Sequence, residues 1–336
     1  MSPFTKKDFD EFQDTESRWC WQIGMRPKDR YVHALNFSLY VGGPDVIGAQ
    51  NLGALCIWGG TLPSERLLFV LKTYQPTIIW TSPSYAWQLG EKALKCGIDP
   101  KKDLSIKKII VAGELGGSID ATRKAIEDLW GAEVYDFYGL SDIFGACAAM
   151  CEAKDGLHIA ENHILVETVD IHTGEVLEPG QVGELVFTTL RKHARPLIRF
   201  RTGDIGWIDN TPCSCGRTHG RIHISGRKDD MFIVSAVNVF PSDIEAVIRE
   251  LSGITGEYLI RVFDKDFTCK YSVEIEKNAD SPESDDTVAA RVSDALKARI
   301  GVKPYSVIVH PDGGLDTRSE HKSRRIIDER KLDFTI

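Results

Sequence analysis

The chain has 336 residues, of which 42% are hydrophobic and 27% charged, and its formal net charge is −8. This composition is typical of globular material long enough for more than one domain. The acidic balance argues against a nucleic-acid or membrane-surface partner. No apolar run approaches the roughly 18 residues of a membrane span, and the first twelve residues lack the apolar core of a secretory signal. We therefore expect a cytoplasmic protein.

The first part of the chain alternates helical and strand patterns. Thr5 is a plausible N-cap for the first helix. Helices are predicted over residues 6–25, 63–74 and 119–130, and strands over residues 52–58, 77–81, 107–112 and 132–138. This alternation predicts a largely parallel sheet with helices packed on its faces.

Two further changes of pattern divide the rest of the chain. Short alternating strands separated by glycine-rich turns run from Ile159 to about Ile208, which predicts an antiparallel or barrel-like part. After Gly226 come a strand (MFIVSAV), a helix over 242–251, a strand pair, a helix over 287–300 and a last strand, SVIVHP. We predict an α/β large domain over residues 1–226 and a small mobile α+β domain over residues 227–336.

The motif VAGELGGS, from Val111 to Ser118, ends a predicted strand in Gly113-Glu114 just before a helix. Backbone N–H groups then face the carboxyl edge of a parallel sheet, where open α/β folds bind ligands. An ordinary turn between a strand and a helix is the alternative.

The motif YDFYGLSDIFG, from Tyr135 to Gly145, runs from a strand into a crowded aromatic turn. Its rings can sandwich a flat heterocycle, and Asp142 can hold a divalent cation near phosphates. The alternative is an aromatic strand end that packs into the core.

Three further motifs carry charged residues at predicted turns. PLIRFRTGDIGWI places Asp204 at a turn, where a carboxylate can accept two hydrogen bonds from the hydroxyls of a ribose. The alternative is that its charged residues form ordinary ion pairs at the surface. GRKDDMF is typical of a charged hinge between two domains. LDTRSEHKSRRIIDER predicts a polar loop with Lys322 before a basic helix, which in isolation is a solvated face.

Three of the eight cysteines and one histidine fall into two pairs: Cys151 with His158, and Cys213 with Cys215. Four such ligands satisfy a tetrahedral zinc site, and because no position stays open the role would be structural. Reduced thiols in adjacent loops are the alternative. Cys147 and His219 are further candidate ligands.

Together and in this order, the five motifs resemble the adenylate-forming (acyl-CoA synthetase-like) enzymes, and most closely their phenylacetate-CoA ligase branch. The segments that carry the resemblance are YGLSDIFG, PLIRFRTGDIG, CSCGRTHGRIHISGRKDDMFIV, VNVFPSDIE and RSEHKSRRIIDER. The likeness covers nearly the whole chain. Some members of this branch carry a zinc site comparable to the one above.

The resemblance implies two half-reactions. A carboxylate attacks the α-phosphate of ATP to give an acyl-adenylate and pyrophosphate, and the thiol of CoA then displaces AMP. It implies that Lys322 stabilises charge during adenylation and that Asp142 takes the place of a magnesium-binding glutamate. It also implies a hinge at Asp229. The remaining implied roles are nucleotide binding for Gly113, Glu114, Asp136, Tyr138, Gly139, Asp204 and Arg227, and an acyl pocket for Tyr40, Gly42 and Tyr85.

The sequence departs from the family pattern in three places. The family's phosphate-binding loop normally precedes a stretch resembling TKKDFDEF, which here follows Met1 almost directly. Asp142 is one methylene shorter than glutamate. Ser235-Ala236 stands where the family tends to have Arg-Gly, which makes transfer to CoA less secure than adenylation.

These departures leave three functions open. The chain is an aryl- or acyl-CoA ligase, complete or as one part of a split enzyme; or it passes AMP to another acceptor, such as a deazaflavin coenzyme; or it is a non-catalytic nucleotide-binding remnant. As partners we expect a small carboxylic acid, ATP and CoA, together with a second copy of the chain or a complementing N-terminal chain.

Overall fold

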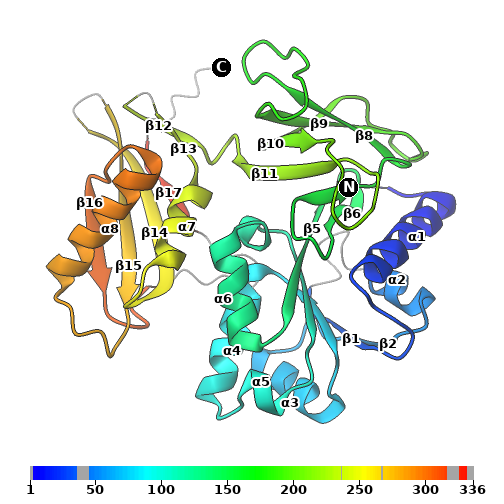
Figure 1. The fold of residues 1–336 in the computed structure, drawn as a ribbon, viewed down its shortest axis with the longest axis horizontal. Coiled ribbons are helices and arrows are strands. Elements are labelled where there is room, and N and C mark those ends of the chain that lie inside the picture. Colours follow the sequence, from blue (N-terminus) through cyan, green and yellow to red (C-terminus); the bar gives the residue numbers. More distant parts are fainter. Residues whose placement is uncertain (1–2, 36–44, 236, 266–267, 316–324, 331–336) are drawn as a thin grey trace. The chain divides into compact units, whose positions relative to one another are not determined.

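The computed structural model describes residues 3–35, 45–235, 237–265, 268–315 and 325–330 (Figure 1). The chain divides into two compact units, residues 1–225 (unit 1) and 226–336 (unit 2), and each has a sheet and a hydrophobic core of its own. Within the described part of the chain, no helix is long and apolar enough to cross a membrane.

The helices of unit 1 begin with α1 (Lys6–Gln22). The predicted cap at Thr5 is confirmed: Thr5 Oγ1 accepts from the amide of Asp8 at 3.1 Å, while the Thr5 amide donates to the Asp8 carboxylate at 2.9 Å. The others are α2 (Val46–Asn51), α3 (Ser64–Tyr74), α4 (Pro83–Lys95), α5 (Pro100–Asp103) and α6 (Asp120–Trp130), with a 3₁₀ turn at Leu115–Gly117.

A single mixed sheet of eleven strands runs through unit 1, in the order β2-β1-β3-β4-β5-β6-β7-β11-β10-β9-β8. Its first five members pair in parallel, and pairs such as β5–β6, β7–β11 and β8–β9 are antiparallel. The strands are β1 (Arg30–His33), β2 (Leu55–Trp58), β3 (Ile78–Thr81), β4 (Lys108–Ala112), β5 (Glu133–Leu140), β6 (Phe144–Met150), β7 (Leu157–Ile159), β8 (Ile164–Val169), β9 (Gly183–Thr189), β10 (Phe200–Asp209) and β11 (Arg221–Arg227). The predicted antiparallel part thus continues the parallel half instead of forming a separate barrel.

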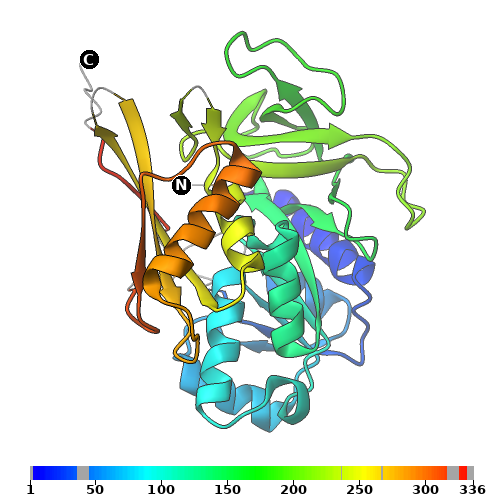
Figure 2. The same ribbon diagram turned by 60° about the vertical axis from the view of Figure 1, so that its left-hand side comes forward.

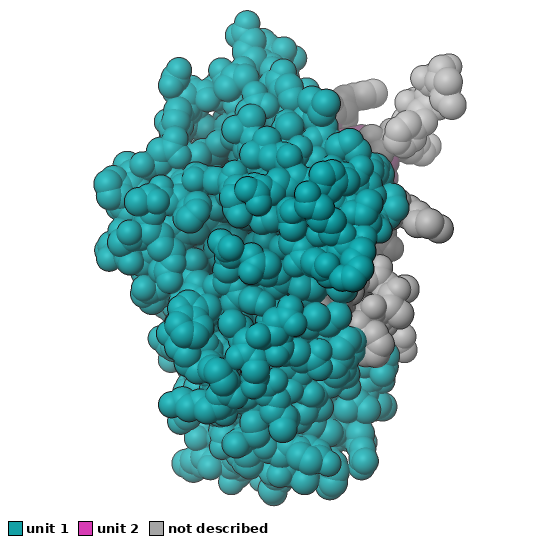
Figure 3. Space-filling model, turned by 90° about the vertical axis from the view of Figure 1, so that its right-hand side faces the viewer, with its two compact units in different colours: residues 1–225 teal, residues 226–336 magenta. Residues whose placement is uncertain are grey.

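The parallel half of this sheet is covered on both faces. Alternate residues of each strand enter different cores: Ile78 and Trp80 of β3 join the cluster on the α1 side, whereas Ile79 joins the cluster on the opposite face, with residues of α3, α4 and α6. Figure 2 shows helices on both sides of the strands. Figure 3 shows the surface of unit 1 on the side of α1 and α2.

Unit 2 is built on a four-stranded sheet in the order β16-β15-β14-β17, and α7 and α8 pack together beside it. Its core joins Tyr258 of β14, Tyr271 of β15 and Val292 of α8. The elements are β12 (Phe232–Val234), β13 (Val237–Val239), α7 (Pro241–Glu250), β14 (Ile254–Lys265), β15 (Thr268–Lys277), α8 (Asp285–Ile300), β16 (Ser306–His310) and β17 (Ile326–Asp328).

Two predictions for unit 2 were wrong. The strand MFIVSAV is a hairpin, because Ser235 has a φ of +51° and turns the chain between β12 and β13. The segment after Lys322 contains no basic helix in its described residues 325–330, but the strand β17. There Ile326 pairs in parallel with Ile260 of β14, whose edge is otherwise open, and β-branched residues suit a strand.

Candidate functional site

The carboxyl edge of β4 and β5 brings the first two motifs together. The strands are parallel, and Ala112 is the register partner of Phe137, so Gly113 and Tyr138 follow at the same edge. Gly113 has a φ of +84°, a left-handed conformation that glycine adopts without strain. The chain can therefore turn sharply here and present backbone groups to a ligand.

Glu114 connects this edge to the N-terminus of α4. The Oγ of Ser84 donates to one Glu114 carboxylate oxygen at 2.8 Å, and the amide of Ser84 donates to the other at 3.1 Å. The next residue, Tyr85, shares a hydrogen bond of 3.0 Å between its hydroxyl and the Oγ of Ser64, and burial raises its pKa. The predicted nucleotide loop and the predicted acyl-pocket residue Tyr85 thus lie on neighbouring segments. Tyr40 and Gly42 lie outside the described residues.

Asp136 lies inside β5 with only 4% of its surface exposed. Burial raises its pKa to about 7, although Ser118 donates a 2.5 Å hydrogen bond to the carboxylate. A Cβ on Gly117 would come within 2.6 Å of the Asp136 carboxyl carbon, so glycine is required for this approach. Asp136 is therefore held under the 3₁₀ turn of the first motif.

Tyr138 and Asp204 are 66 residues apart in sequence and in direct contact. The Tyr138 hydroxyl donates to the Asp204 carboxylate at 2.5 Å, and Asp204 is 5% exposed. Burial, followed by the charge of Asp204, raises the pKa of Tyr138, so that the phenol stays a donor. Next to it, a Cβ on Gly139 would lie 1.7 Å from the carbonyl oxygen of Gly145, which leaves no room for any other residue.

Asp142 is partly exposed and contacts two basic residues. Its carboxylate lies 3.2 Å from Nη2 of Arg195, and its backbone carbonyl accepts from Nζ of Lys192 at 2.7 Å. Burial lowers the pKa of Lys192. Neither basic residue was predicted, and the only sequence signal is their position in a basic stretch shortly before the Thr-Gly-Asp motif.

Arg227 and Asp229 belong to the segment where unit 2 begins. Arg227 Nη2 lies 3.3 Å from the Asp229 carboxylate, and the Asp229 side chain is 76% exposed. An exposed pair of this kind contributes little to stability. The hinge at Asp229 stays a prediction. Lys322 lies outside the described residues.

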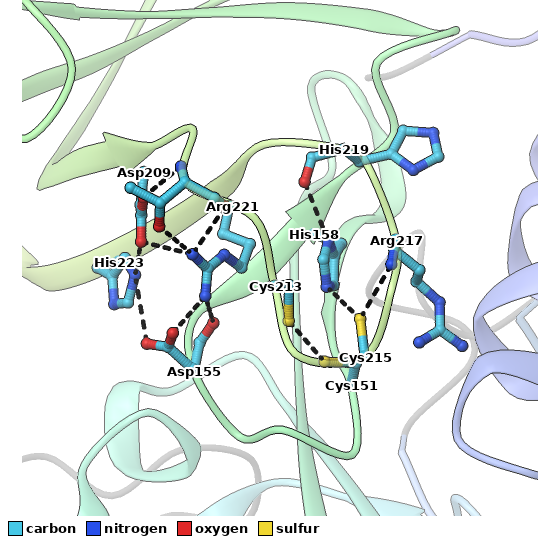
Figure 4. Close-up of polar contacts among 11 residues, drawn as sticks. Cys151, Asp155, His158, Asp209, Cys213, Cys215, Arg217, His219, Arg221 and His223 are labelled. Atoms are coloured by element: carbon cyan, nitrogen blue, oxygen red, sulfur yellow. Dashed lines mark hydrogen bonds and ion pairs between the residues drawn. The ribbon is translucent and has the colours of Figure 1, made fainter.

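The four predicted metal ligands converge on one point (Figure 4). One donor atom from each of Cys151, His158, Cys213 and Cys215 lies within 4.8 Å of all the others. The sulfurs of Cys151 and Cys213 are 3.7 Å apart, and Cys215 Sγ is 3.3 Å from Nε2 of His158. Zinc–sulfur bonds of about 2.3 Å place two tetrahedral thiolates about 3.8 Å apart. The four residues can therefore hold a metal ion.

The backbone around the cluster orients two of its ligands. Nδ1 of His158 lies 3.1 Å from the carbonyl oxygen of His219, so it carries the proton and leaves Nε2 free to face the sulfurs. The amide of Arg217 donates to Cys215 Sγ at 3.5 Å. His219 thus contributes its backbone rather than its ring. Cys147 is buried in β6 and does not belong to the four-residue group.

Arg221 braces the two loops that carry the ligands, and sequence reasoning missed it. It is 1% exposed, pairs with Asp155 in the first loop, and donates from Nη2 to Asp209 at 2.6 Å and to the Thr211 hydroxyl at 3.0 Å ahead of the second (Figure 4). His223 lies 3.9 Å from the carboxylates of both aspartates. A buried arginine between two acids fixes loop positions with directional bonds. The only feature of the sequence that points to Arg221 is its position at the start of an apolar strand.

Known proteins resemble this chain in sequence and in fold. The family model of the AMP-binding enzymes matches residues 12–190, and that of the AMP-binding enzyme C-terminal domain matches residues 236–330. Phenylacetate-coenzyme A ligase of Thermus thermophilus is 33% identical over 98% of this chain and 77% of its own length. Phenylacetate-coenzyme A ligase of Escherichia coli is 32% identical over 98% of this chain and 76% of its own.

A solved structure agrees with these relatives. The crystal structure of 2-hydroxyisobutyryl-CoA ligase in the postadenylation state, in complex with 2-HIB-AMP, superposes with a TM-score of 0.90 at 29% identity, over 97% of this chain and 70% of that one. The chain therefore belongs to the adenylate-forming, AMP-binding family of acid–CoA ligases, and its relatives of known name include the phenylacetate-CoA ligases.

Proposed function

We propose that the chain activates an aryl or other organic carboxylic acid with ATP and transfers the acyl group to CoA. The observation that supports this most strongly is the contact between Tyr138 and Asp204. It joins the Tyr-Gly turn after β5 to the Thr-Gly-Asp motif of β10, beside Gly113 and Glu114. An adenylate needs these three elements in one place.

In this proposal Asp204 accepts hydrogen bonds from the ribose hydroxyls, and Tyr138 stacks on or borders the adenine. The 2.5 Å hydrogen bond from Tyr138 holds the Asp204 carboxylate in one orientation before the nucleotide arrives. Gly113 leaves backbone groups accessible at the edge, while Glu114 and Asp136 hold the surrounding turns in place. Arg227 is a further nucleotide-binding residue in this proposal.

The chemistry requires cations where negative charge develops. When a carboxylate oxygen attacks the α-phosphate, the bond to pyrophosphate breaks and charge accumulates on the phosphate oxygens. Lys322 stabilises that charge, because a preorganised cation lowers the barrier most where charge develops in the transition state. Asp142 together with ATP would hold magnesium, which neutralises the leaving pyrophosphate. The CoA thiol then attacks the acyl carbonyl, and AMP leaves.

We propose that the acid binds near Tyr85 and that it is an aryl acid. Its ring lies at the start of α4, and its hydroxyl is engaged with Ser64, so the ring offers an apolar surface close to the loop of Glu114. The named phenylacetate-CoA ligases among the relatives support the same substrate class.

Acid-dependent exchange between ATP and labelled pyrophosphate tests the proposal, because it isolates adenylation from transfer to CoA. We expect exchange with an aryl acid from a panel of aryl and short aliphatic acids, and loss of exchange in Lys322→Ala. A folded chain that binds AMP but exchanges pyrophosphate with none of the acids would contradict the proposal.

We also propose that the group of Cys151, His158, Cys213 and Cys215 holds one structural zinc ion. Three sulfurs and one imidazole nitrogen match the ligands zinc prefers, and four protein ligands leave no position for a substrate. The bound ion would tie the loop after β6 to the loop before β11, the two loops that Arg221 already bridges.

A further inference from the structure

The connection between β9 and β10 brings two basic residues to Asp142. Residues 191–195, which we call the basic loop, have the sequence Arg-Lys-His-Ala-Arg. Nζ of Lys192 donates to the backbone carbonyl of Asp142 at 2.7 Å, and Nη2 of Arg195 lies 3.2 Å from the Asp142 carboxylate. Asp142 belongs to the turn between β5 and β6, and β5 carries Tyr138, the proposed adenine contact. The basic loop therefore places two cations at the end of the hairpin that borders the proposed nucleotide site.

The basic loop is held in place by Asp8 of α1. The amides of His193 and Ala194 donate to the two carboxylate oxygens of Asp8 at 2.7 and 2.9 Å, and Asp8 is only 6% exposed. Burial raises the pKa of Asp8, but the hydrogen bonds from these amides and from Thr5 lower it to about 2. The Asp8 carboxylate is therefore charged at neutral pH, and charge-assisted hydrogen bonds fix the middle of the loop.

Lys192 and Arg195 differ in their surroundings. Lys192 is only 9% exposed, and its Nζ lies over the ring of Phe4, 4.7 Å from the centroid. Lys192 is thus enclosed by the protein and holds the turn at Asp142. The side chains of Arg195 and Asp142 are each 42% exposed. An ion pair with this exposure is worth at most about 1 kcal/mol, so a ligand that offers stronger acceptors to the guanidinium can replace the carboxylate.

The backbone of Arg195 adopts a conformation that favours glycine. Its φ is +54°, in the left-handed region that residues with a Cβ rarely occupy. A non-glycine residue in this region costs on the order of 1 kcal/mol, and such residues are concentrated at functional sites, where the surrounding structure imposes the conformation. Here the contacts of Asp8 with the two preceding residues impose it. The loop thus keeps an arginine where glycine would be less strained.

From these contacts we propose that Arg195 binds the β- and γ-phosphates of ATP and then the pyrophosphate that leaves. The inference rests on the proposed function, in which Asp142 lies beside the phosphates. When ATP binds, the Arg195 guanidinium exchanges the Asp142 carboxylate for phosphate oxygens, to which it can donate two parallel hydrogen bonds. The exchange also frees the Asp142 carboxylate for the role proposed above.

Calorimetric titration with pyrophosphate, ATP and AMP, without added magnesium, tests this assignment. AMP has only the α-phosphate, whereas pyrophosphate and ATP have the phosphates that Arg195 would contact. In Arg195→Gly we expect the affinity for pyrophosphate and for ATP to fall about tenfold, because a charge-assisted contact is lost, and the affinity for AMP to stay within about twofold. Glycine is the chosen replacement because it adopts a φ of +54° without strain, so the loop keeps its backbone conformation.

Arg199→Gly is the matched control. Arg199 ends the same connection, has a φ of +50° and is 51% exposed, but its partner is Glu167 of β8, 3.1 Å away. The substitution removes the same charge from the same backbone conformation and should leave the affinity for pyrophosphate within about twofold of the wild-type value.

A second variant should act in the opposite direction. Asp142→Asn removes the carboxylate that pairs with Arg195 and repels an anion, so we expect it to bind pyrophosphate about threefold more tightly than the wild-type chain. If Arg195→Gly fails to fold, Arg195→Asn replaces it, since asparagine also tolerates a left-handed φ.

Equal affinity for pyrophosphate in Arg195→Gly and in the wild-type chain would overturn the inference, as would a folded wild-type chain that binds no pyrophosphate. An equal loss of affinity for AMP and pyrophosphate would show a structural role instead, and an equal loss in Arg199→Gly would show an effect of net charge alone; either result would also overturn it. A chain that binds pyrophosphate through Arg195 but shows no acid-dependent exchange would overturn the proposed function and leave the phosphate contact standing.

Discussion

Two clusters in unit 1 assemble residues from distant parts of the sequence, and they do so in different ways. At the carboxyl edge of β4 and β5, acids accept hydrogen bonds from the protein, as Asp204 does from Tyr138 and Glu114 does from Ser84. In the Cys151–His158–Cys213–Cys215 cluster the donor atoms face one another, and their outer atoms are held by backbone groups.

In our proposal, this difference separates a site for exchangeable ligands from a site for a permanently bound ion. The carboxyl edge combines an exposed glycine, Gly113, with carboxylates that are buried or held by neighbouring groups of the protein. The cysteine–histidine cluster points all four donors at a single centre. A tetrahedral ion bound there would have no open coordination position for water or substrate. The predictions below test this contrast, from the largest expected effect to the smallest.

The first prediction concerns the metal cluster. Cys213→Ser removes one of the four proposed ligands, so we expect the purified chain to lose the proposed zinc ion and about 4 kcal/mol or more of its free energy of unfolding. Metal analysis and denaturant unfolding measure the two effects. Cys96→Ser is the matched control, because Cys96 is exposed at the end of α4 and should change neither quantity. A wild-type chain that folds fully without metal would contradict the prediction.

The second prediction concerns the ribose contact. Asp204→Asn keeps the shape of the side chain but removes its charge, so we expect kcat/KM for ATP in pyrophosphate exchange to fall roughly a hundredfold, or about 3 kcal/mol. The free energy of unfolding should change much less. Equal values of kcat/KM in variant and wild type would place the ribose elsewhere.

The third prediction is a pH dependence of stability. The pKa of Asp136 rises from 3.8 to about 7 on folding because the carboxyl is buried. The folded chain thus binds this proton more tightly than the unfolded chain, and the free energy of unfolding falls as the pH rises from about 4 to about 7. Asp136→Asn removes this contribution, on the order of 4 kcal/mol.

The comparison of slopes isolates Asp136 from other acids. Burial also raises the pKa values of Glu16 and Asp45, so these two acids give both proteins a residual slope of the same sign. Denaturant unfolding at several pH values measures the difference between variant and wild type. Identical slopes would mean that Asp136 ionises normally in the folded chain.

The fourth prediction compares two tyrosines. Tyr138→Phe removes the hydrogen bond to Asp204, so we expect KM for ATP to rise about fivefold, or roughly 1 kcal/mol. Tyr85→Phe removes the same group from the bond with Ser64 and should raise KM for the acid instead. Pyrophosphate exchange with each substrate varied in turn measures both. If Tyr138→Phe raised KM for the acid and Tyr85→Phe raised KM for ATP, our assignment of Tyr138 to the nucleotide and Tyr85 to the acid would be wrong.

Much of this fold could be predicted from the sequence because local signals agreed with the tertiary structure. The cap at Thr5, the apolar strand over residues 107–112 and the alternating strands after Ile159 each carry a pattern that burial reinforces. The strand β17 could not be predicted, since its three residues follow a basic stretch and are extended only because β14 offers them an edge.

The candidate site was predictable in its residue types but not in its contacts. The sequence places Tyr138, Asp204 and the four metal ligands in motifs, yet only the folded sheet brings Tyr138 to Asp204 across 66 residues. Arg221 lies in one of the segments that carry the resemblance, but the segment does not predict its role, because that role depends on acids that are distant in sequence. Such pairs become visible only when burial shows which charges must be compensated.

Binding of AMP, measured by calorimetric titration of the wild-type chain and of Asp204→Asn, tests most directly whether the carboxyl edge of β4 and β5 is an adenylate site. We predict one AMP per wild-type chain and an affinity roughly a hundredfold weaker in the variant. A folded wild-type chain that binds no AMP, or that binds it as tightly without the Asp204 charge, would contradict the account.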